Sequence, residues 1–275
     1  MNILVCVKQV PDTTVVKIDP VTNTLIRDGV PSILNPFDGF ALEMALRMKE
    51  AAGGTVTVVS MGPAQAAAVL RDSLAVGADD AVLVSGREFG GSDTLATSYI
   101  LSRTVKTIEE RKGVKFDAIF CGKQAIDGDT GQVGPEMAEH LDYAQITYAT
   151  ELVSCEDGKL RIRKETADGY DVLEAALPVV ISVTKTPFEL RFPTVKKRLA
   201  ANRAEITTIT PQDMEGQIYL SCAGLKGSPT KVKKSFTPQH NKTCVIVEED
   251  SLPVSAVKLV ALLSDAKKIL GVQHN

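Results

Sequence analysis

The first half of the chain alternates short apolar runs with longer stretches in which apolar residues recur at helical spacing. The apolar runs cover residues 3–7, 55–60, 81–84 and 118–121. Each run is apolar on both faces, as is typical of strands that helices cover from two sides. This alternation predicts βαβ units and an α/β fold built on a doubly wound parallel sheet.

The stretches between the runs predict four amphipathic helices. They are expected to begin after Asn35, after Gly62-Pro63, after Ser92 or Asp93, and after the glycine-rich stretch 128–134. The inward positions of the first helix are Phe40, Ala41, Met44, Ala45 and Met48. Glu43, Arg47 and Lys49 are expected to face solvent on its other side.

The pattern changes after residue 145. Asp157-Gly158 and Asp168-Gly169 separate runs of alternating polarity, which predicts antiparallel hairpins added to the sheet. The apolar run 179–183 is expected to return to the central sheet. From residue 187 onward the apolar residues are sparse until 252–270, which predicts one last amphipathic helix and an extended C-terminal arm that packs on another subunit.

Composition narrows the class of protein. The 275 residues are 44% hydrophobic and 24% charged, with a net charge of −3, which favours a folded chain and argues against nucleic-acid binding. The five cysteines are scattered and none has a partner at metal-ligand spacing, so we expect reduced thiols and no metal site. No signal peptide and no apolar run of about 20 residues is present, so we expect a cytoplasmic protein without a membrane span.

The segment most informative about chemistry is GKQAIDGDTGQVGP, residues 122–135, between a predicted strand and a predicted helix. In open α/β sheets ligands lie outside the carboxyl ends of the strands, where helix N-termini present free amides to phosphates. Gly128, Gly131 and Gly134 allow close approach to a pyrophosphate, Thr130 offers a hydroxyl, and Asp127 or Asp129 offers an acceptor for ribose. A glycine-rich turn that only caps the helix explains the same pattern.

Two other loops are predicted at the same edge of the sheet. Lys8-Gln9 and Asn35-Pro36-Phe37-Asp38 follow the first strand, and Met61-Gly62-Pro63 follows the second. Three converging loops indicate a binding site. Asn35 either caps its helix or turns its amide toward an adenine or ribose.

The segment SGREFGGSD, residues 85–93, resembles the glycine-rich loop of ATP-dependent adenylating enzymes. That loop normally follows the first strand, so adenylation is an alternative rather than the favoured activity, and a second cofactor over this loop is another. No catalytic residue is predicted, because no serine, cysteine or carboxylate pair lies near a histidine in a catalytic pattern. Any redox chemistry must therefore come from a bound cofactor.

Several motifs together resemble the β subunit of electron transfer flavoproteins: VCVKQVPD, NPFDGFALEMAL, VVSMGPAQAAAVLRDSLAVGADDAVLV, GKQAIDGDTGQVGP and ALPVVISV. The resemblance implies a sheet of the adenine-nucleotide hydrolase-like type, with a nucleotide-binding domain at 1–190. Residues 191–275 would then be a recognition loop and an arm that clasps the α subunit of a heterodimer. The implied nucleotide contacts are Cys6, Asn35, Pro36, Phe37, Asp38, Met61, Gly122, Lys123, Gln124, Ala125, Ile126, Asp127, Gly128, Asp129, Thr130, Gly131, Gln132 and Val133.

The family contains two kinds of β subunit. One holds a structural AMP; the other holds FAD, accepts hydride from NADH and bifurcates the electrons. In the second kind one electron goes to the α-subunit FAD and an acyl-CoA dehydrogenase, and the other to ferredoxin or flavodoxin. The small residues of the 122–135 segment favour the FAD-containing kind, with AMP as the alternative.

Residues 191–205, RFPTVKKRLAANRAE, resemble the partner-recognition loop of the family. The resemblance implies that Phe192 and Pro193 anchor in a groove of the dehydrogenase while Lys196, Lys197 and Arg198 surround them. A solvated basic turn is the alternative interpretation.

Overall fold

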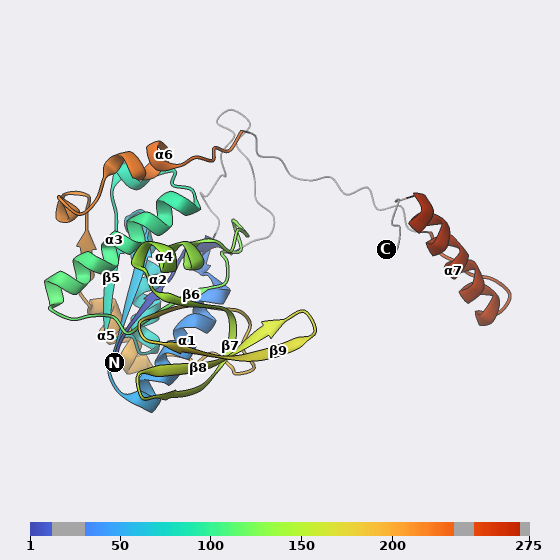
Figure 1. The fold of residues 1–275 in the computed structure, drawn as a ribbon, viewed down its shortest axis with the longest axis horizontal. Helices are drawn as coiled ribbons and strands as arrows, with labels where there is room; N and C mark the ends of the chain where they lie inside the picture. Colours follow the sequence, from blue (N-terminus) through green and yellow to red (C-terminus); the bar gives the residue numbers. More distant parts are fainter. Residues whose placement is uncertain (13–30, 234–244, 270–275) are drawn as a thin grey trace. The chain divides into compact units, whose positions relative to one another are not determined.

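The computed structural model describes residues 1–12, 31–233 and 245–269, and the chain divides into two units, Met1–Ser235 and Phe236–Asn275. The first unit contains a nine-stranded sheet with helices on both faces (Figure 1). The sheet strands are β1 (Asn2–Cys6), β4 (Thr55–Met61), β5 (Asp80–Val84), β6 (Ala118–Gly122), β7 (Ala144–Glu156), β8 (Lys159–Thr166), β9 (Gly169–Ala176), β10 (Val179–Val183) and β11 (Thr207–Ile209). The four strands predicted for the first half are confirmed to within one residue at each end.

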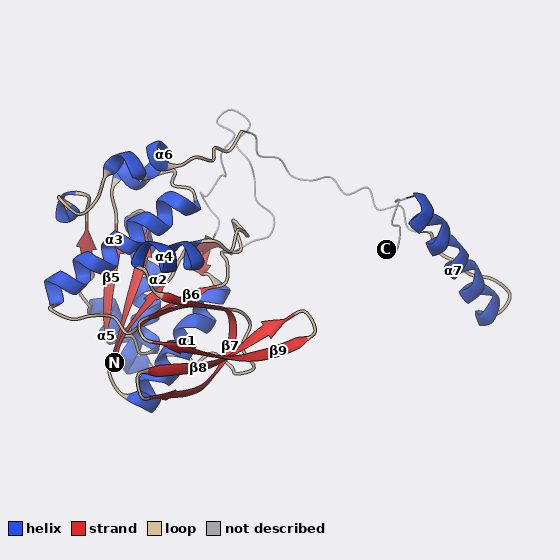
Figure 2. Cartoon of the chain, in the orientation of Figure 1, coloured by secondary structure: helices blue, strands red, loops and turns tan. Residues whose placement is uncertain are grey.

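The sheet is doubly wound, as predicted, because alternate residues of its strands face two separate cores. Ile3 and Val5 of β1 face a core that includes α1 (Pro36–Ala52) and α2 (Ala67–Val76), which follows the 3₁₀ turn η1 (Ala64–Ala66). Leu4 and Cys6 face the opposite core, with α3 (Thr94–Lys112) and α4 (Val133–Leu141). Figure 2 shows the strands enclosed between these helices. Strands that are apolar on both faces need cover on both sides, which explains this arrangement.

The strand order is β11-β5-β4-β1-β6-β10-β7-β8-β9. From β1 the chain winds through α1 and α2 toward β5, and then α3 returns it to β6 on the other side of β1. The winding direction therefore reverses between β1 and β6. This reversal separates the loops after the two strands and opens a crevice at their carboxyl ends.

The predicted hairpins are confirmed. Asp157-Gly158 joins β7 to β8 with positive φ at both residues, as a tight hairpin turn requires. The second turn joins β8 to β9 through Ala167 and Asp168, one residue before the predicted Asp168-Gly169, because Thr166 pairs with Gly169. The strand predicted at 179–183 returns to the sheet as β10, parallel to both β6 and β7.

Several elements were not predicted. The short strands β2 (Gln9–Pro11) and β3 (Ser32–Leu34) pair as a separate ribbon above the sheet edge. After β10 come the helices α5 (Val195–Arg203) and α6 (Gly224–Gly227) and the 3₁₀ turns η3 (Gln212–Met214) and η4 (Leu220–Cys222). The 3₁₀ turn η2 (Arg87–Phe89) lies earlier, between β5 and α3. Strand β11 extends the sheet beside β5, and Ile209 and Met214 are buried in the core of α3. The first unit thus includes the segment from 191 to 233.

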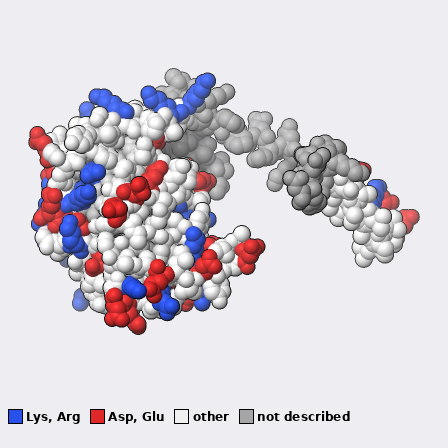
Figure 3. Space-filling model, in the orientation of Figure 1, with Lys and Arg blue, Asp and Glu red and all other residues white. Residues whose placement is uncertain are grey.

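The second unit contains α7 (Leu252–Ile269), which confirms the last predicted helix. Leu252, Val257, Val260 and Leu263 are among the exposed apolar residues of this helix. Figure 3 shows few charged side chains on the visible face of this helix. An exposed apolar helix is what an arm that packs on another subunit would present, but the packing itself stays a prediction.

One prediction for α1 is wrong. Glu43, which was expected to face solvent, is only 3% exposed. Its carboxylate is covered by Arg191, which lies 148 positions away in the sequence and pairs with it. Helical periodicity within α1 could not indicate this partner.

Candidate functional site

The three loops predicted to converge do lie together at the carboxyl edge of β1, β4 and β6. They enclose a cavity of about 90 Å³ under the β2–β3 ribbon. Lys8 follows β1, Met61 and Gly62 end β4, and Asp127 belongs to the loop after β6. Most of its lining comes from the segments after β1 and β4, so the cavity lies beside the reversal point of the sheet, where open α/β folds bind ligands.

Asp38 bridges the carboxyl ends of β1 and β6 by hydrogen bonds. Its carboxylate accepts hydrogen bonds from Lys8 N at 2.8 Å and from Gly122 N at 3.0 Å. A Cβ at residue 122 would lie 2.4 Å from Asp38 Oδ1, so this contact requires glycine. Burial raises the pKa of Asp38 to about 7, although hydrogen bonds from Asn35, Lys8 and Gly122 act to lower it. Asp38 therefore fixes the separation of the two loops.

Asn35 is completely buried and holds the loop after β6. Its Nδ2 donates to Gln124 O at 2.9 Å, and its Oδ1 accepts from Ile126 N at 3.2 Å. The side chain makes no capping hydrogen bond to α1, although Asn35 occupies the N-cap position. Both polar groups are thus engaged by the loop, an outcome that neither interpretation from the sequence included.

The rest of the loop is open. Residues 126–130 are exposed, and no atom lies within 4 Å of the Cβ that a side chain at Gly128 would have. Gly131 has a φ of +67°, which favours glycine. No side chain caps α4, so amides at its start remain for a phosphate. The segment is therefore not closed by its own packing.

The acidic residues of the loop have partners within the protein. Lys8 Nζ lies 2.7 Å from Asp127 Oδ1, and Gln124 Nε2 donates to Asp129 Oδ1 at 2.7 Å. Each carboxylate keeps a second oxygen, which a ribose hydroxyl could use as an acceptor. Thr130 is exposed beside them, whereas the Gln132 side chain contacts Thr94 of α3.

Gly134 serves packing rather than approach to a ligand. It is buried, and a Cβ there would lie 2.7 Å from Cys121 Sγ. The missing side chain lets α4 lie close to β6. The surroundings of Gly134 therefore do not support the expectation that this residue approaches a pyrophosphate.

The two cysteines at the site are not nucleophiles. Cys6 Sγ points into the core and lies 3.9 Å from Met137 Sδ. Burial, with a contribution from Asp38, raises the pKa of Cys6 to about 12, and burial also raises the pKa of Cys121. Any contact of Cys6 with a ligand must come from its main chain.

Lys123 lies between two aromatic rings at the edge of the loop. Its Nζ is 4.9 Å from the centroid of Phe37 and 5.8 Å from that of Tyr148. Tyr148 is exposed with a φ of +57°, which is unusual for a large side chain. Sequence reasoning missed Tyr148, since it comes from a strand on the far side of β10 and no local motif marks it.

Part of the 85–93 segment packs against other segments of the chain, although Arg87, Glu88, Gly90 and Gly91 are exposed. Asp93 caps α3 by accepting from Ala96 N at 3.1 Å, and its own amide donates to Ser228 Oγ at 2.9 Å. A Cβ at Gly91 would lie 2.6 Å from Leu225 Cγ. Gly91 therefore makes room for the segment around α6, which argues against an ATP-binding role for residues 85–93.

The residues predicted to bind a partner belong to a different region, at the start of α5. Phe192 is 92% exposed, Lys196 and Lys197 are exposed, and Pro193 is half-buried. Within the described residues, no group of three metal-ligating side chains comes together. None of the helices in those same parts of the chain is long and apolar enough to cross a membrane.

Comparison with known proteins identifies relatives along almost the whole chain. Residues 22–214 match the model of the electron transfer flavoprotein domain. The chain is 50% identical over 276 residues to the electron transfer flavoprotein subunit beta of Megasphaera elsdenii, covering 98% of this chain and all of that protein. It is 46% identical to Protein FixA of Azotobacter vinelandii, over 92% of this chain and 90% of that one. It is also 46% identical to the caffeyl-CoA reductase-Etf complex subunit CarD of Acetobacterium woodii, over 86% and 88%.

Proposed function

This chain belongs to the electron transfer flavoprotein family, and we propose that it is the FAD-binding β subunit of a bifurcating electron transfer flavoprotein. Members named subunit beta pair with an α subunit, so the working unit is a heterodimer. The observation that carries the choice of cofactor is the open space at Gly128, at the reversal point of the sheet. AMP in the same place, with the flavin only in the α subunit, is the alternative.

The residues of the site fit the phosphates of an adenine nucleotide. Amides at the start of α4 and the Lys8 and Lys123 side chains supply positive charge at the carboxyl edge of the sheet. Asp38 and Asn35 do not need to touch the nucleotide, because they hold the loops that do. The contribution of this chain is to bind and orient the nucleotide.

When bound, FAD would supply the redox chemistry, taking hydride from NADH. One electron would pass to the α-subunit FAD and an acyl-CoA dehydrogenase, and the other to ferredoxin or flavodoxin. The thiols of Cys6 and Cys121, which are buried at the site with raised pKa values, are not suited to take part. Gly91 lies against Leu225 and Asp93 against Ser228, and these contacts leave the adenylation alternative without support.

Two features support the proposed partners. The apolar residues of α7 are exposed and suit a contact with the α subunit, and Phe192 suits an apolar groove of a dehydrogenase. The printed name of the Acetobacterium woodii relative places that protein in a complex with a reductase of a CoA ester. An acyl-CoA dehydrogenase belongs to the same substrate class.

Counting the nucleotides released from the purified heterodimer tests this proposal. We expect two FAD per heterodimer and reduction of the flavin by NADH; one FAD and one AMP would establish the alternative. Gly128→Val should lower nucleotide occupancy about tenfold with an unchanged unfolding midpoint, because the space at residue 128 is open in the folded chain. Ala167→Val, in the exposed turn between β8 and β9, is the matched control and should leave occupancy unchanged.

A further inference from the structure

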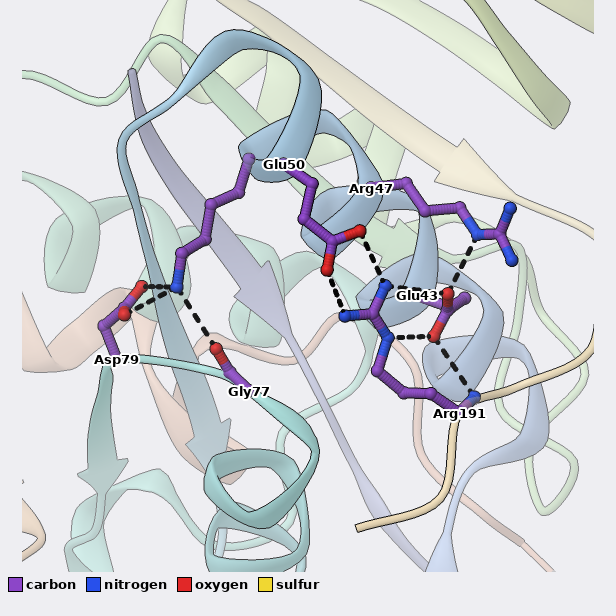
Figure 4. A network of polar contacts seen from close by, with 7 residues as sticks. Glu43, Arg47, Glu50, Gly77, Asp79 and Arg191 are labelled. Carbon is purple, nitrogen blue, oxygen red and sulfur yellow. Dashed lines mark hydrogen bonds and ion pairs between the residues drawn. The ribbon is translucent and has the colours of Figure 1, made fainter. Parts of the chain in front are cut away.

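The segment that precedes α5 is fastened to α1 through Arg191. The guanidinium donates from Nε to Glu43 Oε2 at 2.8 Å and from NH2 to Glu43 Oε1 at 3.0 Å. It also donates from NH1 to Glu50 Oε1 at 2.5 Å and from NH2 to Glu50 Oε2 at 3.2 Å. Figure 4 shows Arg191 between the two carboxylates, two turns apart on one side of α1. Such a forked arrangement fixes the direction of the side chain as well as its place.

Glu43 is the buried center of this cluster. It is 3% exposed, accepts from Arg47 Nε at 2.8 Å, and accepts from the main-chain amide of Arg191 at 3.3 Å. Burial acts to raise the pKa of Glu43, but the hydrogen bonds from Arg191 and Arg47 outweigh it and lower the pKa below its usual value. Glu43 is therefore ionised, and it binds both the side chain and the backbone of residue 191.

The other end of the short segment is fixed by α5. Thr194 caps this helix, accepting from Lys197 N at 3.2 Å, and Arg198 forms an ion pair with Asp72 of α2. Only residues 192 and 193 lie between the two attachments. Phe192 is nevertheless 92% exposed, next to the buried contacts of Arg191.

An almost fully exposed phenyl ring on a backbone fixed at both sides is the kind of apolar anchor that a partner protein can cover. If the backbone on both sides is already fixed, docking loses little conformational entropy, so each contact contributes more to affinity. Exposed Lys196 and Lys197 next to Phe192 suit an apolar pocket with an acidic rim.

We infer that Glu43, assisted by Glu50, is a positioning residue that clamps Arg191 and so presents Phe192 to the acyl-CoA dehydrogenase. This inference rests on the proposed function, since it assigns a docking role to Phe192. Glu43 does not touch the partner or the cofactor; it acts through Arg191. The clamp explains why a carboxylate on the inner part of α1 is buried at all, because a buried charge without a partner would destabilise the fold.

The test uses the complete heterodimer with NADH as reductant and the acyl-CoA dehydrogenase of the same organism at varied concentration. Glu43→Gln should raise the KM for the dehydrogenase about tenfold, with kcat, flavin content and the rate of flavin reduction by NADH unchanged. Glu50→Gln should raise KM about threefold, since Glu43 still binds Arg191. Arg191→Lys keeps the charge but not the fork, so it should also raise KM.

Lys49→Gln is the matched control. It removes a charge and the 2.6 Å ion pair with Asp79 from the same helix without touching Arg191, so KM should not change. A KM that rises equally in Lys49→Gln, or an unchanged KM in Glu43→Gln and Arg191→Lys, would overturn the inference.

Phe192→Ala distinguishes the docking role of Phe192 from the positioning role of Glu43. If Phe192→Ala raises KM and Glu43→Gln does not, docking at Phe192 stands and the positioning role is wrong. If Phe192→Ala leaves KM unchanged, the docking role itself is wrong and the inference falls with it. Should Glu43→Gln fail to fold, Arg191→Lys decides the question with the same readout.

Discussion

Gly134 offers a quantitative test of how α4 is seated on the sheet. In Gly134→Ala the new methyl carbon would lie 2.7 Å from Cys121 Sγ, about 1 Å closer than ordinary contact allows. The sulfur has little room to retreat, because Cys121 is buried and its Sγ already lies 3.7 Å from Ile181 O. Overpacking of this kind costs about 1–3 kcal/mol, and the better helix propensity of alanine offsets about 1 kcal/mol.

We therefore expect Gly134→Ala to lower the free energy of unfolding by up to about 2 kcal/mol, measured by urea denaturation. Cys121→Ala alone should cost about 1 kcal/mol in lost apolar burial. The double variant should be about 1 kcal/mol more stable than the sum of the two single effects, because removing the sulfur makes room for the methyl group.

Gly128→Ala is the control, since no atom lies within 4 Å of its added carbon, and its stability should stay within about 0.5 kcal/mol of the unaltered protein. Strict additivity of the two single variants, or a Gly134→Ala effect no larger than that of Gly128→Ala, would refute the packing argument. In that case Gly134 would again count as a residue that a ligand can contact.

Two further predictions concern buried or capping carboxylates. Asp93→Ala should lower the free energy of unfolding by about 1–2 kcal/mol, because it removes the cap of α3 and the hydrogen bonds that Asp93 accepts from Thr230. Urea denaturation measures this free energy, and an unchanged value would contradict the capping role. Asp38 has a pKa raised to about 7 in the folded state, so its contribution to stability is greatest below about pH 4 and is lost as the pH rises through 7. The loss is on the order of 4 kcal/mol, and Asp38→Asn should abolish this part of the pH dependence; an unchanged pH profile of the urea midpoint would contradict it.

Much of the architecture follows from local pattern. Short runs such as 55–60 and 118–121 are apolar on both faces, and a strand with that pattern needs helices on both sides. The same pattern places the loops after β1, β4 and β6 at one edge, because the carboxyl ends of parallel strands lie together. The Asp157-Gly158 turn determines the first hairpin through its preference for positive φ.

Other features needed the tertiary structure. Strand β11 is three residues long, so its pattern is too short to recognise, and it forms only because β5 offers a free edge. Asn35 was assigned to a cap or a ligand, yet its amide binds Gln124 and Ile126 of a loop about ninety positions away. Tyr148 reaches Lys123 only because β10 places β7 near β6.

The sequence by itself therefore determined the longer elements of the sheet, their layering and the edge at which the candidate site lies, because periodicity and turn chemistry act over a few residues. Only the tertiary structure decided which side chains bind, which pack and which position others. Glu43 is the example: its helical position indicated a solvent-facing residue, and a guanidinium 148 positions away made it a buried ion. Pairings of that kind depend on the folded path of the chain, which no local pattern contains.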